Sequence, residues 1–140
     1  MSNPANTTAY RGQDGRLWVD VTEAKTLVAA DSGYVQNVKY ANGVVTLPAT
    51  AVPGVWTVRN GGVVINSEGS GQDGNLISVD PNSSDTIIGF DVADGTSADG
   101  KKLNNTAATA RVGDEVTILS VAATNGPYLI GMKGTWAREA

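Results

Sequence analysis

Apolar and polar residues alternate in short stretches along this chain. In residues 16–21, the side chains of Leu17, Val19 and Val21 share one face. Trp18 falls on the opposite face. A period of two residues is typical of a β-strand with one buried face. The same alternation predicts further strands at residues 55–59, 75–79, 86–90 and 115–121.

Two of these strands indicate which side chains enter the core. Trp56 and Val58 share one face of their strand, and Val116 and Ile118 share one face of theirs. Residues 115–121 carry apolar side chains on both faces, so we expect that strand to lie in the middle of a sheet.

Three Asn-Gly pairs lie between apolar runs, at Asn42-Gly43, Asn60-Gly61 and Asn125-Gly126. Asn-Gly tolerates positive φ at both central positions of a type I′ turn, which joins neighbouring antiparallel strands. The pattern therefore predicts three β-hairpins.

Short strands at this spacing are typical of all-β folds. We expect an antiparallel β-sandwich or barrel of about ten short strands. Helix is expected only as one turn near residues 22–25. Residues 1–15 show no periodicity and are predicted to form an extended N-terminal arm, ahead of a single β domain of residues 16–140.

Composition excludes several kinds of chemistry. The chain has 140 residues, a net charge of −4 and neither cysteine nor histidine. Acidic proteins lack the basic surface that nucleic acids require. Without histidine there is no Ser-His or Cys-His nucleophile and no histidine-ligated zinc. Paired carboxylates could still hydrolyse a glycoside, but the aspartates lie mostly in predicted turns, so we expect no enzyme activity and no cofactor or nucleic-acid partner. No apolar run approaches the length of a membrane span, so we expect no membrane partner either.

Residues 78–91 (SVDPNSSDTIIGFD) concentrate oxygen-bearing side chains and suggest a calcium loop. An EF-hand needs glycine at position 6 and glutamate at position 12. Counted from Asp80, those positions hold Asp85 and Asp91. We expect a turn between two strands, and an irregular calcium site between Asp80 and Asp91 remains the alternative.

An ordered set of short motifs runs through most of the chain. It comprises KTLVAADSG (25–33), VVTLPA (44–49), PGVWTV (53–58), ISVDPNSSDTIIG (77–89), RVGDEVTIL (111–119) and GTW (134–136). This set resembles a β-rich module of tailed-phage structural proteins, which is found in capsid decoration (cement) proteins and in fibre or tail-tip proteins. The resemblance implies an all-β fold, assembly as a homotrimer and attachment to a viral shell. It supplies no catalytic residues.

The small size of the chain favours the decoration function over a fibre, because a fibre would carry a long shaft or further repeats. The resemblance thus predicts a virion protein that is made in the host cytoplasm and binds the outer surface of the head, with the major capsid protein and its own copies as partners. Tyr10, Arg11, Arg16 and Trp18 are the candidate contact residues. The alternative is a tail-tip or fibre module that binds a host surface or sugar.

Overall fold

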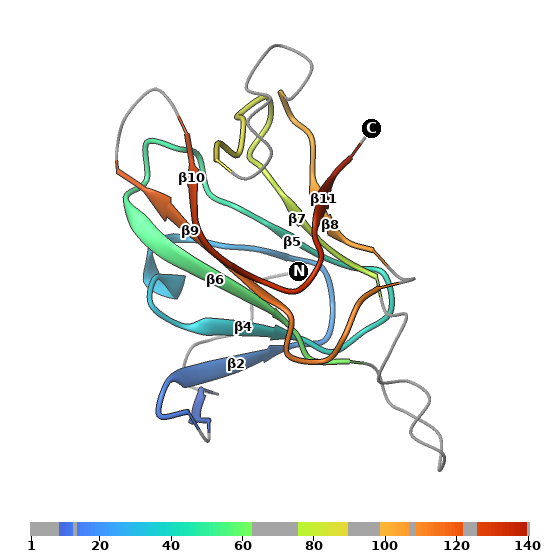
Figure 1. Cartoon of the computed structure of the whole chain (residues 1–140). Helices are drawn as coiled ribbons and strands as arrows, with labels where there is room; N and C mark the ends of the chain where they lie inside the picture. The colour runs from blue at the N-terminus through green and yellow to red at the C-terminus, as the bar shows by residue number, and fades with distance from the viewer. Residues whose placement is uncertain are drawn as a thin grey trace.

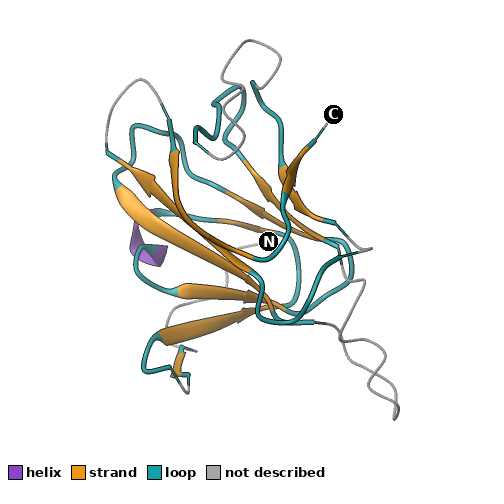
Figure 2. Ribbon diagram, in the orientation of Figure 1, coloured by secondary structure: helices purple, strands orange, loops and turns teal. Residues whose placement is uncertain are grey.

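A computed structural model of the chain describes residues 9–12, 14–62, 76–89, 99–106, 109–121 and 126–139. Eleven strands and one short 3-10 helix occur in these residues (Figure 2). The elements are β1 (Tyr10–Arg11), β2 (Leu17–Val21), β3 (Lys25–Thr26), η2 (Ala29–Asp31), β4 (Val35–Val38), β5 (Gly43–Thr46), β6 (Gly54–Asn60), β7 (Ile77–Asp80), β8 (Leu103–Asn105), β9 (Glu115–Ser120), β10 (Tyr128–Lys133) and β11 (Ala137–Arg138). The all-β prediction is confirmed.

The strands form two sheets that face each other (Figure 1). Sheet A has the order β1-β2-β4-β6-β9-β10, and sheet B has the order β11-β8-β7-β5-β3. The buried core lies between them and includes Trp56, Val58, Val116 and Ile118, as the alternation predicted. The arrangement is a sandwich, and in the described part of the chain the sheets do not close into a barrel.

The chain crosses from one sheet to the other at each step between β2 and β7. As a result, β2, β4 and β6 lie parallel in sheet A, and β3, β5 and β7 lie parallel in sheet B. Strands β8, β9, β10 and β11 then add to both sheets in antiparallel pairs. The sheets are therefore mixed, and the expectation of antiparallel pairing throughout was wrong.

The Asn-Gly pairs have different outcomes. Asn42-Gly43 is not a hairpin, because the strands on its two sides, β4 and β5, belong to different sheets. Both strands carry core side chains, Val38 and Val45, so they cover each other across the core and do not pair edge to edge. The strand expected after Asn60-Gly61 lies outside the described residues. β9 and β10 pair as antiparallel neighbours, so the pairing expected around the third Asn-Gly is confirmed, whereas Asn125 and with it the predicted type I′ turn lie outside the described residues.

Two smaller expectations also fail. Residues 86–90 form no strand in their described part, where the only ladder contact is a single bridge between Ile88 and Tyr128. No helical turn forms at residues 22–25; β3 begins at Lys25, and the 3-10 helix follows at Ala29–Asp31.

The described helix is far too short to span a membrane.

The segment that resembled a calcium loop folds as a turn up to Gly89. The Asp85 amide donates to Asn82 O at 2.9 Å, and Asp85 Oδ2 accepts from the Thr50 amide at 3.0 Å. This carboxylate therefore ties the turn to the connection before β6. Within the described residues no three acidic, histidine or cysteine side chains gather as metal ligands, and Asp91 lies outside those residues.

Gly43 offers a test of the crossing between the sheets. Asn42 has a φ of 57°, whereas the φ of Gly43 lies outside the left-handed region. The requirement for glycine at position 43 therefore comes from the lack of space for a side chain and not from the backbone conformation. A Cβ at Gly43 would lie 2.4 Å from the buried Val38 Cγ1. Gly43→Ala should therefore lower the free energy of unfolding by about 1–3 kcal/mol in urea denaturation.

Gly131→Ala is the matched control. Its new Cβ would meet nothing closer than 3.6 Å. Stability should be unchanged or slightly raised there, because alanine in a strand loses less conformational freedom on folding than glycine. Equal effects of the two substitutions would contradict the packing at the crossing.

Candidate functional site

One row of polar side chains crosses the outer face of sheet A, the face that points away from sheet B. The strand registers place Asp20, Asn37, Arg59, Glu115 and Lys133 opposite one another on five strands. In β2, β4, β6 and β9 the neighbouring positions are buried, and Lys133 on β10 shares the face of its register partner Glu115, so the row faces outward. We call these five residues the polar row.

Hydrogen bonds link the first half of the polar row. Arg59 Nη1 donates to Asn37 Oδ1 at 2.7 Å, and Asn37 Nδ2 donates to Asp20 Oδ1 at 3.1 Å. Tyr10, on β1, donates from its hydroxyl to the same Asp20 oxygen at 2.6 Å. Burial, and then the bond to Asp20, raise the pKa of Tyr10. This hydrogen bond connects the edge strand β1 to the polar row.

Trp18 lies beside the polar row, and its ring contacts Arg59 and Gly12. The Arg59 guanidinium carbon is 4.5 Å from the ring centroid. A Cβ on Gly12 would lie 2.6 Å from Trp18 Cε2, so the Gly12 backbone packs against the indole. Stacking between a guanidinium and an indole is attractive, because the ring face carries negative charge density. Trp18 therefore fixes both Arg59 and the loop after β1.

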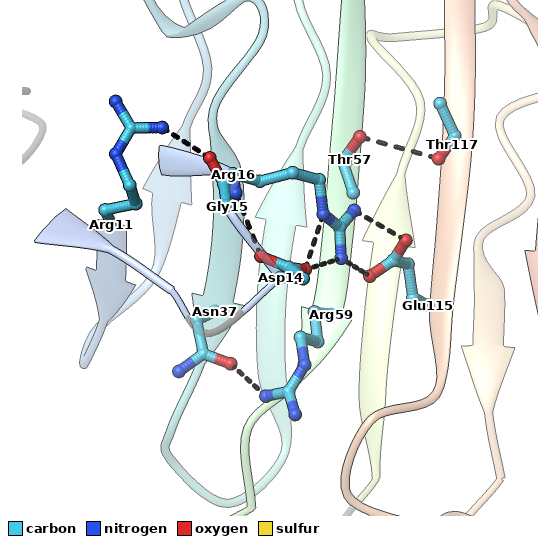
Figure 3. Close-up of polar contacts among 9 residues, drawn as sticks. All are labelled: Arg11, Asp14, Gly15, Arg16, Asn37, Thr57, Arg59, Glu115 and Thr117. Atoms are coloured by element: carbon cyan, nitrogen blue, oxygen red, sulfur yellow. Dashed lines mark hydrogen bonds and ion pairs between the residues drawn. The ribbon is translucent and has the colours of Figure 1, made fainter. Parts of the chain in front are cut away.

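Arg16 joins this loop to the far side of the sheet (Figure 3). Its guanidinium bonds Glu115 through two nitrogens at 2.8 and 2.9 Å and contacts Asp14 at 2.6 Å. The two carboxylates raise the pKa of Arg16, Glu115 being the larger influence. The pKa of Asp14 is lowered, first by the backbone N–H of Arg16 and then by its side chain.

A shallow groove of about 300 Å³ opens between these groups. It is lined by Asp14, Arg16, Trp18, Arg59, Gly113, Glu115 and Lys133. Arg59 Nη2 and Lys133 Nζ both approach Gly113, where a Cβ would lie 3.7 and 3.8 Å from them. Neither cation is in an ion pair with any described carboxylate.

The groove suits an anionic group and does not suit a stacked sugar. Arg16 pairs with both carboxylates of the lining, Asp14 and Glu115. With Arg59 and Lys133 the lining has three cations against two carboxylates, so its net charge of +1 favours an incoming carboxylate or phosphate. A sugar would need an open aromatic face, and the Trp18 ring already packs against Arg59 and Gly12.

The four candidate contact residues therefore lie together but contact their own chain. Arg16 and Trp18 line the groove, Tyr10 bonds Asp20, and Arg11 Nη1 donates to Gly15 O at 2.5 Å. Sequence reasoning missed the other charged groups at the groove, Asp14, Arg59, Glu115 and Lys133. Three of these occupy alternate, outward positions in strands, which is a visible signal, but only the register between distant strands brings them together.

The scan against protein-family models matches no family for this chain, and the search of curated proteins finds no similar one. The groove must therefore be interpreted from its own geometry.

Substitutions in the groove should separate packing from charge. Trp18→Ala should lower the free energy of unfolding by about 2–3 kcal/mol, less than for a fully buried aromatic residue, because Trp18 is only partly buried. Arg16→Ala should cost less than about 1 kcal/mol, since the pairs of Arg16 are partly exposed to solvent.

Denaturant titrations at low and high ionic strength provide the measurement. Salt should reduce the Arg16 effect and leave the Trp18 effect unchanged, because screening acts on exposed charges only. Arg11→Ala, which removes a single exposed bond, is the control. A larger loss from Arg16→Ala than from Trp18→Ala would contradict this account.

Proposed function

We propose that this chain is a structural protein of a tailed-phage virion, which binds the outside of the head as a decoration protein and stabilises the shell. The ordered motifs that resemble the phage module support the proposal. They coincide with β3 and η2, β5, β6, β7 and β9, which are elements of the two-sheet body. A decoration protein needs such a rigid body and a surface for protein contacts.

The observation that carries the proposal is the edge of sheet A at β10. Strand β10 is the last strand of the sheet, and its first residues are covered by the bridge to Ile88. From Ile130 to Lys133 no described residue pairs with its outer edge. Ile130 and Met132 are 56% and 51% exposed there. An unpaired, apolar edge is a template for pairing with another chain.

The groove adjoins this edge, because Lys133 belongs both to β10 and to the polar row. A partner strand added beside β10 could therefore place an acidic side chain near Lys133 and Arg59. Strand addition draws its affinity from backbone hydrogen bonds and its specificity from side-chain contacts. The partners proposed are the major capsid protein and, in a homotrimer, a second copy of the chain.

Charged substitutions at the edge test the proposal. Ile130→Lys combined with Met132→Lys should weaken binding to heads of the encoding phage at least tenfold, which corresponds to about 1.4 kcal/mol or more. The reason is that lysine on an exposed strand opposes edge pairing. Co-sedimentation with heads stripped of the native protein measures the binding.

Val28→Lys is the matched control, because Val28 is equally exposed, at 48%, but lies at the start of η2 and away from β10. It should bind heads like the unmodified chain. Unchanged binding by the β10 double variant would contradict the proposed surface.

Localisation and solution mass test the rest of the proposal. Gold-labelled antibody against the chain should decorate the heads of intact virions. Label confined to the tail would overturn the decoration function in favour of a tail component. Light scattering should give the mass of a trimer, and a monomer at high concentration would contradict self-assembly.

A further inference from the structure

Three polar side chains meet inside the sandwich, at the end of the core away from the β10 edge. Lys25 on β3 has a side chain that is 0% exposed, and the side chain of Asp31 on η2 is 3% exposed. Lys25 Nζ lies 3.2 Å from Asp31 Oδ1 and donates to Gln36 Oε1 at 2.8 Å. Gln36, on β4, is itself fully buried. An amine, a carboxylate and a carboxamide thus lie in contact and are buried from bulk solvent.

This cluster is costly for a fold that needs only apolar packing at the same place. Removing an ion pair from water costs free energy that the attraction of the two charges often fails to recover. In addition, Gln36 Nε2 is buried and has no hydrogen-bond partner among the described residues. Buried polar atoms are nearly always paired, so an orphaned amide nitrogen calls for an explanation.

We propose that Lys25 and Gln36 react with each other to form an isopeptide cross-link between Nζ and Cδ, with Asp31 carrying the proton. The reaction needs no cofactor and no oxidant. It does not depend on the proposed virion function. In a chain without cysteine it would supply the covalent connection that a disulfide provides elsewhere.

The distances suit this reaction. Gln36 Oε1 is 2.8 Å from Nζ, and the carbonyl bond is about 1.2 Å long, so the Cδ atom lies within about 4 Å of the amine. That is close to the separation of reacting atoms in a near-attack arrangement. Asp31 is held in place on its other side, because Oδ2 accepts the Val28 amide at 2.8 Å. The three groups are thus oriented before any bond forms.

The electrons and protons balance as follows. Asp31 Oδ1, 3.2 Å away, takes one proton from the Lys25 ammonium, which leaves a lone pair on Nζ. The amine lone pair then forms the Nζ–Cδ bond, while the carbonyl electrons move to Oε1. The carbonyl re-forms, the Cδ–Nε2 bond breaks with its electrons on nitrogen, and Nε2 takes the proton from Asp31. Ammonia leaves, and Asp31 takes the second proton from Nζ.

The orphaned amide nitrogen has a place in this sequence. Nε2 is the nitrogen that leaves as ammonia, and no hydrogen bond to a described residue has to break when it departs. Once Nζ is attached to Cδ, both nitrogens sit on one carbon, which brings Nε2 within reach of Asp31. The product contains neither the buried ammonium nor the orphaned amide group. It also joins β3 of sheet B to β4 of sheet A, which are held together across the core by packing.

Trypsin digestion with mass spectrometry of the full chain tests the proposal. Without a cross-link, trypsin releases residues 17–25 and 26–39 as separate peptides, because it cleaves after Lys25. With the cross-link, Lys25 resists cleavage, and one peptide of residues 17–39 appears, lighter by one ammonia. In the cross-linked peptide, cleavage of a backbone bond between residues 25 and 36 should not release two fragments, because the bond between the Lys25 and Gln36 side chains still joins them.

Peptide mapping is needed beside the intact mass, because Asn-Gly pairs also lose ammonia when they cyclise. Residues 17–39 contain no Asn-Gly pair, so a loss there together with resistance at Lys25 supports the cross-link. If both separate peptides persist at full mass after prolonged incubation at alkaline pH, the proposal is overturned. A loss of water, with Lys25 joined to Asp31, overturns it as well.

Three variants assign the roles. Lys25→Arg keeps the charge but removes the nucleophilic amine, and Gln36→Glu removes the amide leaving group. Both should show the uncross-linked mass. Asp31→Asn keeps both reactants and should abolish the cross-link or slow it at least tenfold in folded protein, as checked by circular dichroism. Cross-linking at the unmodified rate in folded Asp31→Asn would overturn the assignment of Asp31.

Discussion

The packing of sheet A against sheet B around Trp56 is the contact on which the other features of this protein depend. The Trp56 side chain is fully buried, and its Nε1 donates to Ser120 Oγ on the neighbouring strand at 3.2 Å. Burial of a large apolar side chain contributes about 1.5–3 kcal/mol, and the core contains more than a dozen such residues. Because the strands from β2 to β7 alternate between the two sheets, the parallel part of each sheet forms only together with that of the other.

This dependence sets the position of both polar clusters. The polar row exists because strands β2, β4, β6, β9 and β10 are aligned in one sheet with their apolar faces inward, which leaves their polar positions in register outside. The buried cluster exists because the crossing from β3 to β4 brings Lys25 and Gln36 face to face between the sheets. A shift of one residue in any strand would turn its polar side chain to the other face.

The outer face of sheet A and the buried cluster also differ in how strongly solvent screens their charges. On the outer face, water and salt screen the charges, so Arg16 and Glu115 hold a loop in place at little cost or gain. Inside the core there is no screening, and Lys25, Asp31 and Gln36 interact strongly with whatever lies within reach. Charged side chains thus connect a loop to the sheet on the outer face and lie in contact with a buried amide inside the core.

The alternation of apolar residues by itself determined that the fold is all-β and which side chains enter the core, as Trp56 and Val58 on β6 demonstrate. The Asn-Gly pair at residues 125–126 added the antiparallel pairing of β9 with β10, because strands close in sequence commonly pair as neighbours. The alternation could not determine the parallel pairing, because it is the same for parallel and antiparallel neighbours, and Asn42-Gly43 fits either a hairpin or a crossing. Only the tertiary structure decided the register between distant strands. That register brings Arg16 to Glu115 within sheet A, and the packing of the two sheets brings Lys25 to Gln36. No local sequence pattern determines either contact, because each joins strands that pair or pack only in the folded chain.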